Sequence, residues 1–164
     1  MAYAMYMKVE GVDGDSTDAA HQKWIEVESY AHAVSQAPGG SLSGQGGLTG
    51  GKADHQDFSI TKRLDSASPI LFLKCCSGEA IPEVTLEICR ATGAKTTFMK
   101  YVFKPCIVAS ICPSGSGKGE DPLPMEQVSF RYGEIDLSYT PTTAKGETGA
   151  AVESKWSTME DIAK

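Results

Sequence analysis

One short segment of the chain resembles a phosphate-binding loop. Gly115-Ser-Gly-Lys-Gly119 combines glycines with a lysine, as in loops whose backbone amides and ammonium group bind phosphates. The full pattern begins with a further glycine and has a serine or threonine directly after the lysine. Cys112 and Gly119 stand at those two positions here, and no helical pattern follows. We therefore interpret the segment as a connection between strands and expect no nucleotide or other cofactor.

Histidines and cysteines could bind a metal or form a nucleophilic pair. His21, His32 and His55 are scattered, and none has a cysteine, a carboxylate or a second histidine at a metal-ligand spacing. The cysteines lack the paired C-x-x-C spacing of metal and redox sites, and we interpret them as small buried side chains in a reducing compartment. They are Cys75, Cys76, Cys89, Cys106 and Cys112. We expect no metal site and no catalytic cysteine.

Two carboxylates share one face of a predicted strand, as an acid–base pair would. Glu83 and Glu87 alternate with Val84, Leu86 and Ile88, so a solvated strand face explains them better than acid–base chemistry. The chain has no Gly-x-Ser-x-Gly nucleophile elbow. We predict that the protein is not an enzyme and has no catalytic residues.

The overall composition is that of one folded domain. The chain has 164 residues, of which 41% are hydrophobic and 22% charged. Its net charge of -6 argues against a nucleic-acid partner, because phosphates attract basic surfaces. No stretch approaches the roughly 20 apolar residues of a membrane span, so we expect no membrane insertion. Residues 1–8 lack the pattern of a signal peptide, so we expect synthesis in the cytoplasm and no general secretion.

Alternating apolar and polar residues predict a mainly β protein with one helix. The helix should span about residues 68–77, with Ser68 as its N-cap, Pro69 in its first turn and Gly78 as its left-handed C-cap. Its side chains are nearly all apolar, so we expect it to be largely covered by its own barrel, with a neighbouring molecule as a further candidate cover. The predicted strands span residues 3–10, 24–35, 56–64, 83–88, 97–103, 106–111, 128–132, 135–139 and 152–158. This pattern favours a small antiparallel β-barrel of two sheets.

Residues 38–51 form a glycine-rich segment inside what we expect to be a single domain over residues 1–164. Long loops without secondary structure are uncommon in compact domains and are usually functional. Leu42 and Leu48 are its sizeable apolar residues, so they are the candidate anchors for another subunit. We predict an extended, mobile loop that serves as a ring-stacking or subunit-interface site. Its candidate residues are Pro38, Gly39, Gly40, Leu42, Gly46, Gly47, Leu48, Gly50 and Gly51.

Six segments, in the same order along the chain, resemble the tube proteins of the haemolysin-coregulated protein (Hcp) family. One of them reads Gln56-Asp-Phe-Ser-Ile-Thr-Lys-Arg-Leu-Asp-Ser-Ala-Ser-Pro-Ile-Leu-Phe72. The others are residues 11–27, 81–90, 98–101, 119–121 and 126–135. The chain departs from the family's usual pattern at Tyr30-Ala-His32, at Ala80 and near Trp156. Each segment alone is weak, but together they cover nearly the whole chain.

The resemblance implies a structural subunit of the type VI secretion inner tube in a Gram-negative bacterium. Such subunits form hexameric rings that stack into a tube, carry effector proteins in the lumen and contribute to virulence. The implied partners are further copies of the chain, a contractile sheath, a tip spike protein and the effectors. The protein would leave the cytoplasm through the type VI apparatus. A monomeric β-barrel that binds a small ligand or peptide is the alternative.

Overall fold

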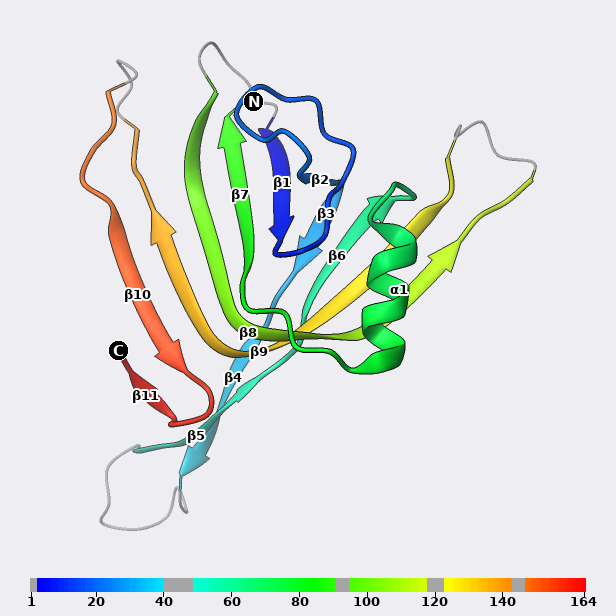
Figure 1. Ribbon diagram of the computed structural model, residues 1–164. Helices are drawn as coiled ribbons and strands as arrows, with labels where there is room; N and C mark the ends of the chain where they lie inside the picture. Colours follow the sequence, from blue (N-terminus) through cyan, green and yellow to red (C-terminus); the bar gives the residue numbers. More distant parts are fainter. Residues whose placement is uncertain (1–2, 40–48, 91–94, 118–122, 143–146) are drawn as a thin grey trace.

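The computed structural model confirms a mainly β protein with one helix (Figure 1). The structure describes residues 3–39, 49–90, 95–117, 123–142 and 147–164. Its elements are β1 Tyr3–Val9, β2 Ile25–Val27, β3 Ser29–Ala31, β4 Val34–Gly39, β5 Thr49–His55, β6 Phe58–Arg63, α1 Ser68–Ser77, β7 Val84–Arg90, β8 Thr96–Ser114, β9 Met125–Tyr139, β10 Val152–Ser157 and β11 Ile162–Ala163.

The strands form one bent antiparallel sheet and one separate ribbon. The main path of the nine-stranded sheet runs β11-β10-β9-β8-β7-β1-β2, while β6 pairs with β9 and β3 pairs with β6. Strands β4 and β5 pair only with each other among the described residues. The expected barrel of two sheets takes the form of one bent sheet, in which β8 and β9 belong to both halves, together with the separate β4–β5 ribbon.

The bend of the sheet lies in the middle of β8 and β9. Residues 97–103 and 106–111 are one strand, and so are 128–132 and 135–139. In the ladder Lys104 pairs with Glu134 and Cys106 pairs with Tyr132, which places Pro105 opposite Gly133. A Cβ atom on Gly133 would lie 3.1 Å from Pro105 Cδ, so the close approach of the two strands favours glycine there.

The predicted strand over residues 24–35 is broken because the chain changes partner. Strand β2 pairs with β1 in one half of the wrap, and β3 pairs with β6 in the other half. Between them the Glu28 amide donates to the Thr61 carbonyl over 2.8 Å. The chain itself therefore bridges the two halves at this corner, where no continuous ladder closes the barrel.

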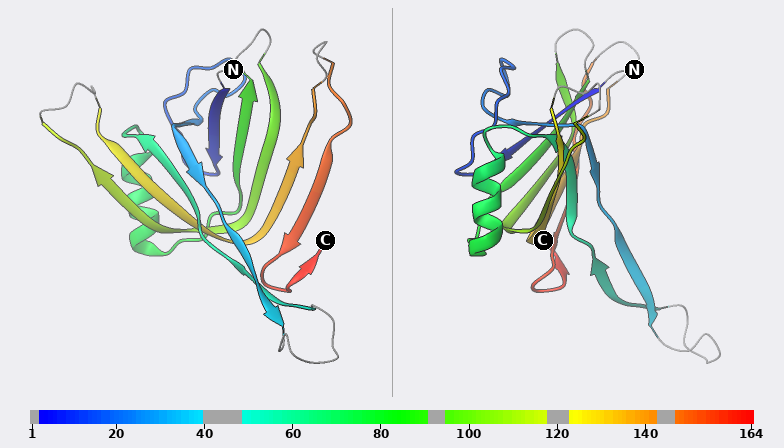
Figure 2. Two further views of the ribbon diagram at one scale, coloured as in Figure 1. Left: turned by 180° about the vertical axis from the view of Figure 1, so that it is seen from behind. Right: turned by 90° about the vertical axis from the view of Figure 1, so that its right-hand side faces the viewer.

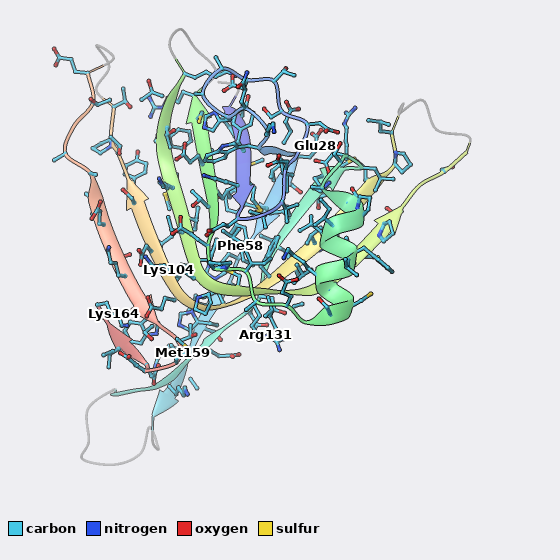
Figure 3. The ribbon with its side chains drawn as sticks, viewed as in Figure 1. Glu28, Phe58, Lys104, Arg131, Met159 and Lys164 are labelled. Atoms are coloured by element: carbon cyan, nitrogen blue, oxygen red, sulfur yellow. The ribbon has the colours of Figure 1, made fainter. Side chains whose placement is uncertain are left out.

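The core fills the hollow of the wrap. Met5, Met7 and Val9 are buried on one face of β1. Phe58 lies at the centre of the hollow, with its ring centroid 4.5 Å from that of Phe103 (Figure 3). Other members include Ile25, Ile60, Leu86, Ile88, Val128, Phe130 and Ile135. The two halves of the sheet thus share a single apolar core.

Helix α1 begins with a different cap from the predicted one. Ala67 is the N-cap, and the carboxylate of Asp65 accepts its amide over 3.0 Å. Ser68 instead donates from Oγ to Glu126 Oε1 over 2.6 Å, so its hydroxyl ties the helix to β9. Gly78 closes the helix at φ 67° and donates to the Lys74 carbonyl, as predicted.

The helix is less covered within the chain than we expected. Leu71 is its one fully buried side chain, whereas Phe72 and Leu73 are 57% and 65% exposed. Cys75 is half buried against the core and Cys76 is exposed. The expectation that its own barrel covers the helix is wrong for this face, because α1 packs against the sheet along only one stripe. Cover from a neighbouring molecule stays a prediction.

A charged side chain occupies a core position that the sequence analysis overlooked. Lys62 follows Phe58 and Ile60 at alternating positions of β6 and is completely buried, while Leu64 is only half buried. Its Nζ lies 2.6 Å from Asp65 Oδ1 and 2.7 Å from Glu126 Oε1. The lysine, two carboxylates and the Ser68 hydroxyl satisfy one another between β6, β9 and the start of α1.

Replacing this lysine should strongly destabilise the protein. In Lys62→Met the carboxylate of Glu126 would stay buried without its counter-charge, which costs about 3–5 kcal/mol of the free energy of unfolding. Urea unfolding measures the loss, and Lys8→Met on an exposed position of β1 should change stability by less than about 0.5 kcal/mol. Adding Glu126→Gln to Lys62→Met should restore part of the loss. Equal effects of the two lysine substitutions would contradict this account.

Candidate functional site

The glycine-rich segment begins and ends in the β4–β5 ribbon, which extends away from the bent sheet (Figure 2). Val34 pairs with His55 and Gln36 with Ala53, and the register shifts between Gln36 and Pro38. The ends of the predicted loop are therefore paired strands. The expectation of a loop over all of residues 38–51 is corrected accordingly. The β4–β5 pairing continues into both ends of this segment, where the side chains are small.

The predicted interface residues divide into two groups. Pro38 pairs with Gly50, and Gly39 pairs with Thr49, so these positions lie in the ladder. Gly51 follows in β5. The remaining candidates, including both leucine anchors, lie outside the described residues: Gly40, Leu42, Gly46, Gly47 and Leu48. Their role in assembly stays a prediction.

A glycine in the ribbon makes room for a side chain from the opposite strand. A Cβ atom on Gly50 would lie 2.7 Å from Gln36 Nε2. The same amide nitrogen donates to the Gly51 carbonyl across the ribbon. Glycine at position 50 therefore lets the Gln36 side chain lie across β5. Its hydrogen bond to the Gly51 carbonyl connects the two strands on one face.

Most of the ribbon side chains that the structure describes are exposed to solvent. Val34 is 51% exposed, and residues 35–37 and 50–52 are exposed as well. A lone two-stranded ribbon is marginally stable in water and leaves backbone donors and acceptors along both outer edges. The arrangement is chemically suited to pairing with, or packing on, another chain.

Four aromatic and imidazole side chains hold the root of the ribbon. His32 precedes β4, His55 ends β5, and Tyr132 and Trp156 come from β9 and β10. The Tyr132 hydroxyl lies 2.6 Å from His32 Nε2 and 3.2 Å from His55 Nδ1. His55 also stacks on Trp156, with 6.3 Å between ring centroids. This root cluster connects both strands of the ribbon to the bent sheet.

The root cluster favours neutral side chains. Burial, with a smaller contribution from His55, lowers the pKa of His32. Burial also raises the pKa of Tyr132 to about 12, aided by the negative charge of Asp57. Asp57 itself pairs with both Nε and a terminal nitrogen of Arg131, the residue labelled beside β9 in Figure 3. Within the part of the chain that the structure describes, the buried atoms His55 Nε2 and Trp156 Nε1 have no hydrogen-bond partner.

Sequence reasoning missed this cluster because its members are far apart along the chain. The structure brings His32 and His55 to one hydroxyl, although the two histidines were interpreted as unrelated. The available signal was their position on either side of the glycine-rich segment, since residues that flank a hairpin meet at its base.

The third histidine and two other predicted positions also differ from expectation. His21 is buried within hydrogen-bond distance of Glu87, so Glu87 does not lie on a freely solvated face. Cys89 is buried beside them, whereas Cys112 is exposed. Burial raises the pKa of the Cys106 thiol to about 12. The interpretation of cysteines as buried side chains therefore holds for Cys89 and Cys106, and it is wrong for Cys76 and Cys112.

Sequence and structure comparisons assign the chain to a family. The family profile described as "Type VI secretion system effector, Hcp" matches residues 6–139. The chain belongs to the Hcp family of type VI secretion proteins. It is 32% identical to "Protein hcp1" of Pseudomonas aeruginosa over 99% of both chains. It is also 27% identical to "Major exported protein" of the same organism, over 81% of this chain and 78% of that protein.

Solved Hcp structures share the bent sheet. A chain described as "Structure of a type six secretion system protein" superposes with a TM-score of 0.93 at 35% identity, over 99% of this chain and 100% of that chain. Hcp1 from Salmonella typhimurium gives a TM-score of 0.81 at 28% identity over all of both chains. The Hcp-like fold predicted from the sequence is confirmed. No helix among the described residues is long and apolar enough to cross a membrane.

The lowered pKa of His32 predicts that acid weakens the folded state. The unfolded chain binds the proton more readily, so the free energy of unfolding should fall as the pH drops below about 6.5. In His32→Gln this fall should be smaller. Urea unfolding of both proteins at a series of pH values measures the difference. If the free energy of unfolding depended on pH in the same way in both proteins, His32 would be equally hydrated in the folded and unfolded states, and the prediction would be wrong.

Proposed function

We propose that this Hcp-family protein is a structural subunit of the type VI secretion inner tube. Copies of the chain associate as hexameric rings, and the rings stack into a tube. One observation carries this proposal. The chain belongs to the Hcp family, and its exposed β4–β5 ribbon extends beyond its folded body. Ring closure requires an interface between two different surfaces of neighbouring copies, and such a ribbon is one suitable surface.

Exposed apolar side chains support self-association. Phe72 and Leu73 on α1, and Val152 and Met159 near the C-terminal strands, are each more than half exposed. Large apolar side chains in contact with water favour burial against a partner, at about 25 cal/mol per Å² removed from water. A second copy of the chain is the partner that the family suggests.

The further partners follow from membership of the family. In our proposal the tube lies inside a contractile sheath, ends at a spike protein and carries effectors in its lumen. Secretion is through the type VI apparatus, in keeping with the similarity to a major exported protein. The role is mechanical, and we propose no catalytic activity for the chain.

A monomeric ligand-binding barrel is the alternative. An aromatic groove between β1, β3, β8 and β9 includes Tyr3, Tyr30, Phe98 and Tyr139, with a volume of about 240 Å³. Ligand pockets commonly measure about 300–1,000 Å³ and enclose most of their ligand. The groove is smaller than this range. A second hollow of about 580 Å³ at the root of the ribbon is lined mostly by polar side chains, among them Asp54, Asp57 and Arg131, and so lacks the apolar lining of most ligand pockets. The tube subunit is therefore the better supported function.

The proposal predicts rings in solution. Light scattering of the purified chain should give the mass of a hexamer, and negative-stain microscopy should show rings. A monomer at micromolar concentration, with no rings on the grid, would overturn the proposal and favour the binding module.

The leucines of the glycine-rich segment should control stacking. Burial of each leucine against a neighbouring ring would contribute about 1.5–3 kcal/mol to stacking. Leu42→Asp together with Leu48→Asp removes both contributions and places charges in the contact, so it should abolish contacts between rings. Single rings should persist in the double variant, as seen by microscopy and sedimentation. Gln45→Asp is the matched control, because it adds a charge to the same segment without removing an apolar side chain. Loss of the rings as well would show that the segment holds the hexamer together.

A further inference from the structure

Three potential metal ligands meet where the segment between β1 and β2 crosses the bent sheet. His21 comes from that segment, and Glu87 and Cys89 come from β7. One ligand atom of each residue lies within 4.8 Å of the others. His21 is 3% exposed and Cys89 is 1% exposed, so the group is shielded from water. We propose that these three side chains form a site for zinc or a similar thiophilic divalent cation.

The distances are close to those of a zinc site. His21 Nε2 lies 3.0 Å from Glu87 Oε2 and 3.9 Å from Cys89 Sγ. Tetrahedral zinc, with bonds of about 2.0–2.3 Å, holds nitrogen and oxygen ligands about 3.3 Å apart and nitrogen and sulfur ligands about 3.6 Å apart. The Glu87 oxygen and the Cys89 sulfur lie within 4.8 Å of each other, against about 3.6 Å for these two ligands on tetrahedral zinc, so binding requires their side chains to move together by up to about 1 Å.

The imidazole is already oriented as a metal ligand. Asp18 Oδ1 lies 2.8 Å from Nδ1 of His21, which leaves Nε2 directed at Glu87 and Cys89. Tyr6 stacks on the ring at 4.3 Å and Trp24 packs against it edge-on. A carboxylate on the distal nitrogen and rings that fix the plane are the surroundings that zinc-binding histidines have in known sites.

Metal binding is coupled to the loss of protons. Both ring nitrogens of His21 lie within hydrogen-bond distance of carboxylate oxygens, and the Cys89 sulfur lies beside them. A thiolate, and not a thiol, is the metal ligand, so binding of the ion displaces the thiol proton of Cys89 to solvent.

The surrounding cations do not occupy the ligand atoms. Lys100 Nζ lies 3.2 Å from Glu87 Oε1, which leaves Oε2 facing the histidine. Lys95 binds the outer oxygen of Asp18 and the Tyr6 hydroxyl. The Thr97 hydroxyl lies 3.1 Å from Glu87 Oε2 and 3.3 Å from Cys89 Sγ.

The nitrogen, oxygen and sulfur donors favour zinc over magnesium or calcium, which prefer oxygen ligands alone.

Metal titration of the whole protein tests the site. Isothermal titration of chelator-treated protein with zinc chloride should give one ion per chain, with proton release that depends on the buffer. Cadmium chloride should produce thiolate-to-metal absorption in the ultraviolet. Both signals should be lost in Cys89→Ala and kept in Cys112→Ala, which removes an exposed thiol. Asp18→Asn should weaken zinc binding about 10- to 100-fold, because it removes the carboxylate behind the imidazole.

Each outcome decides for or against the site. No binding at micromolar zinc, or binding that Cys89→Ala leaves unchanged, would overturn it. Loss of the signals in Cys112→Ala would place the ion on an exposed thiol and equally overturn the proposal. If Cys89→Ala fails to fold, a variant that keeps Cys89 and replaces the other cysteines by alanine gives the decision. Cadmium absorption in that variant supports the site, and its absence contradicts it.

Discussion

The pairing of β8 with β9 is the interaction on which the rest of the structure depends. The ladder runs from Met99 opposite Tyr139 to Ser114 opposite Met125, and it bends where Pro105 faces Gly133. Because both strands continue through the bend, the same two strands supply the centre of each half of the wrap. β7 and β10 join one half of this ladder and β6 joins the other, and the apolar core lies between them.

Three polar clusters attach the remaining segments to this framework. Lys62 and Glu126 connect the start of α1 to the sheet. The Tyr132 hydroxyl contacts His32 and His55, which lie at the root of the two ribbon strands. His21 joins the segment before β2 to Glu87 on β7. Each cluster is at least half buried, so its hydrogen bonds specify one arrangement, and an unpaired member would cost more than the pair contributes. The positions of the peripheral elements are therefore set by a few directional contacts.

This division suits a subunit that assembles. The bent sheet provides a rigid body with its own core, while the ribbon is exposed on both faces and anchored at one end. Hydrogen bonds to Tyr132 and ring contacts of His32 with Phe58 and Phe103 connect the root of the ribbon to the body, so contacts with another copy farther along the ribbon leave the core undisturbed. A lone two-stranded ribbon is only marginally stable in water, which supports the proposed self-association of this Hcp-family chain.

The sequence by itself determined the fold class, the helix at residues 68–77, its Gly78 cap and most strands, because alternation and capping are local patterns. The family could also be inferred from six ordered segments. Only the tertiary structure decided that β2 and β3 pair with different strands, that Lys62 faces the core, and which residues meet His21 and Tyr132. Partners in these clusters lie far apart along the chain, for example 66 residues in His21–Glu87 and 100 in His32–Tyr132. Such contacts depend on the register of several ladders at once, and no local spacing reports that register.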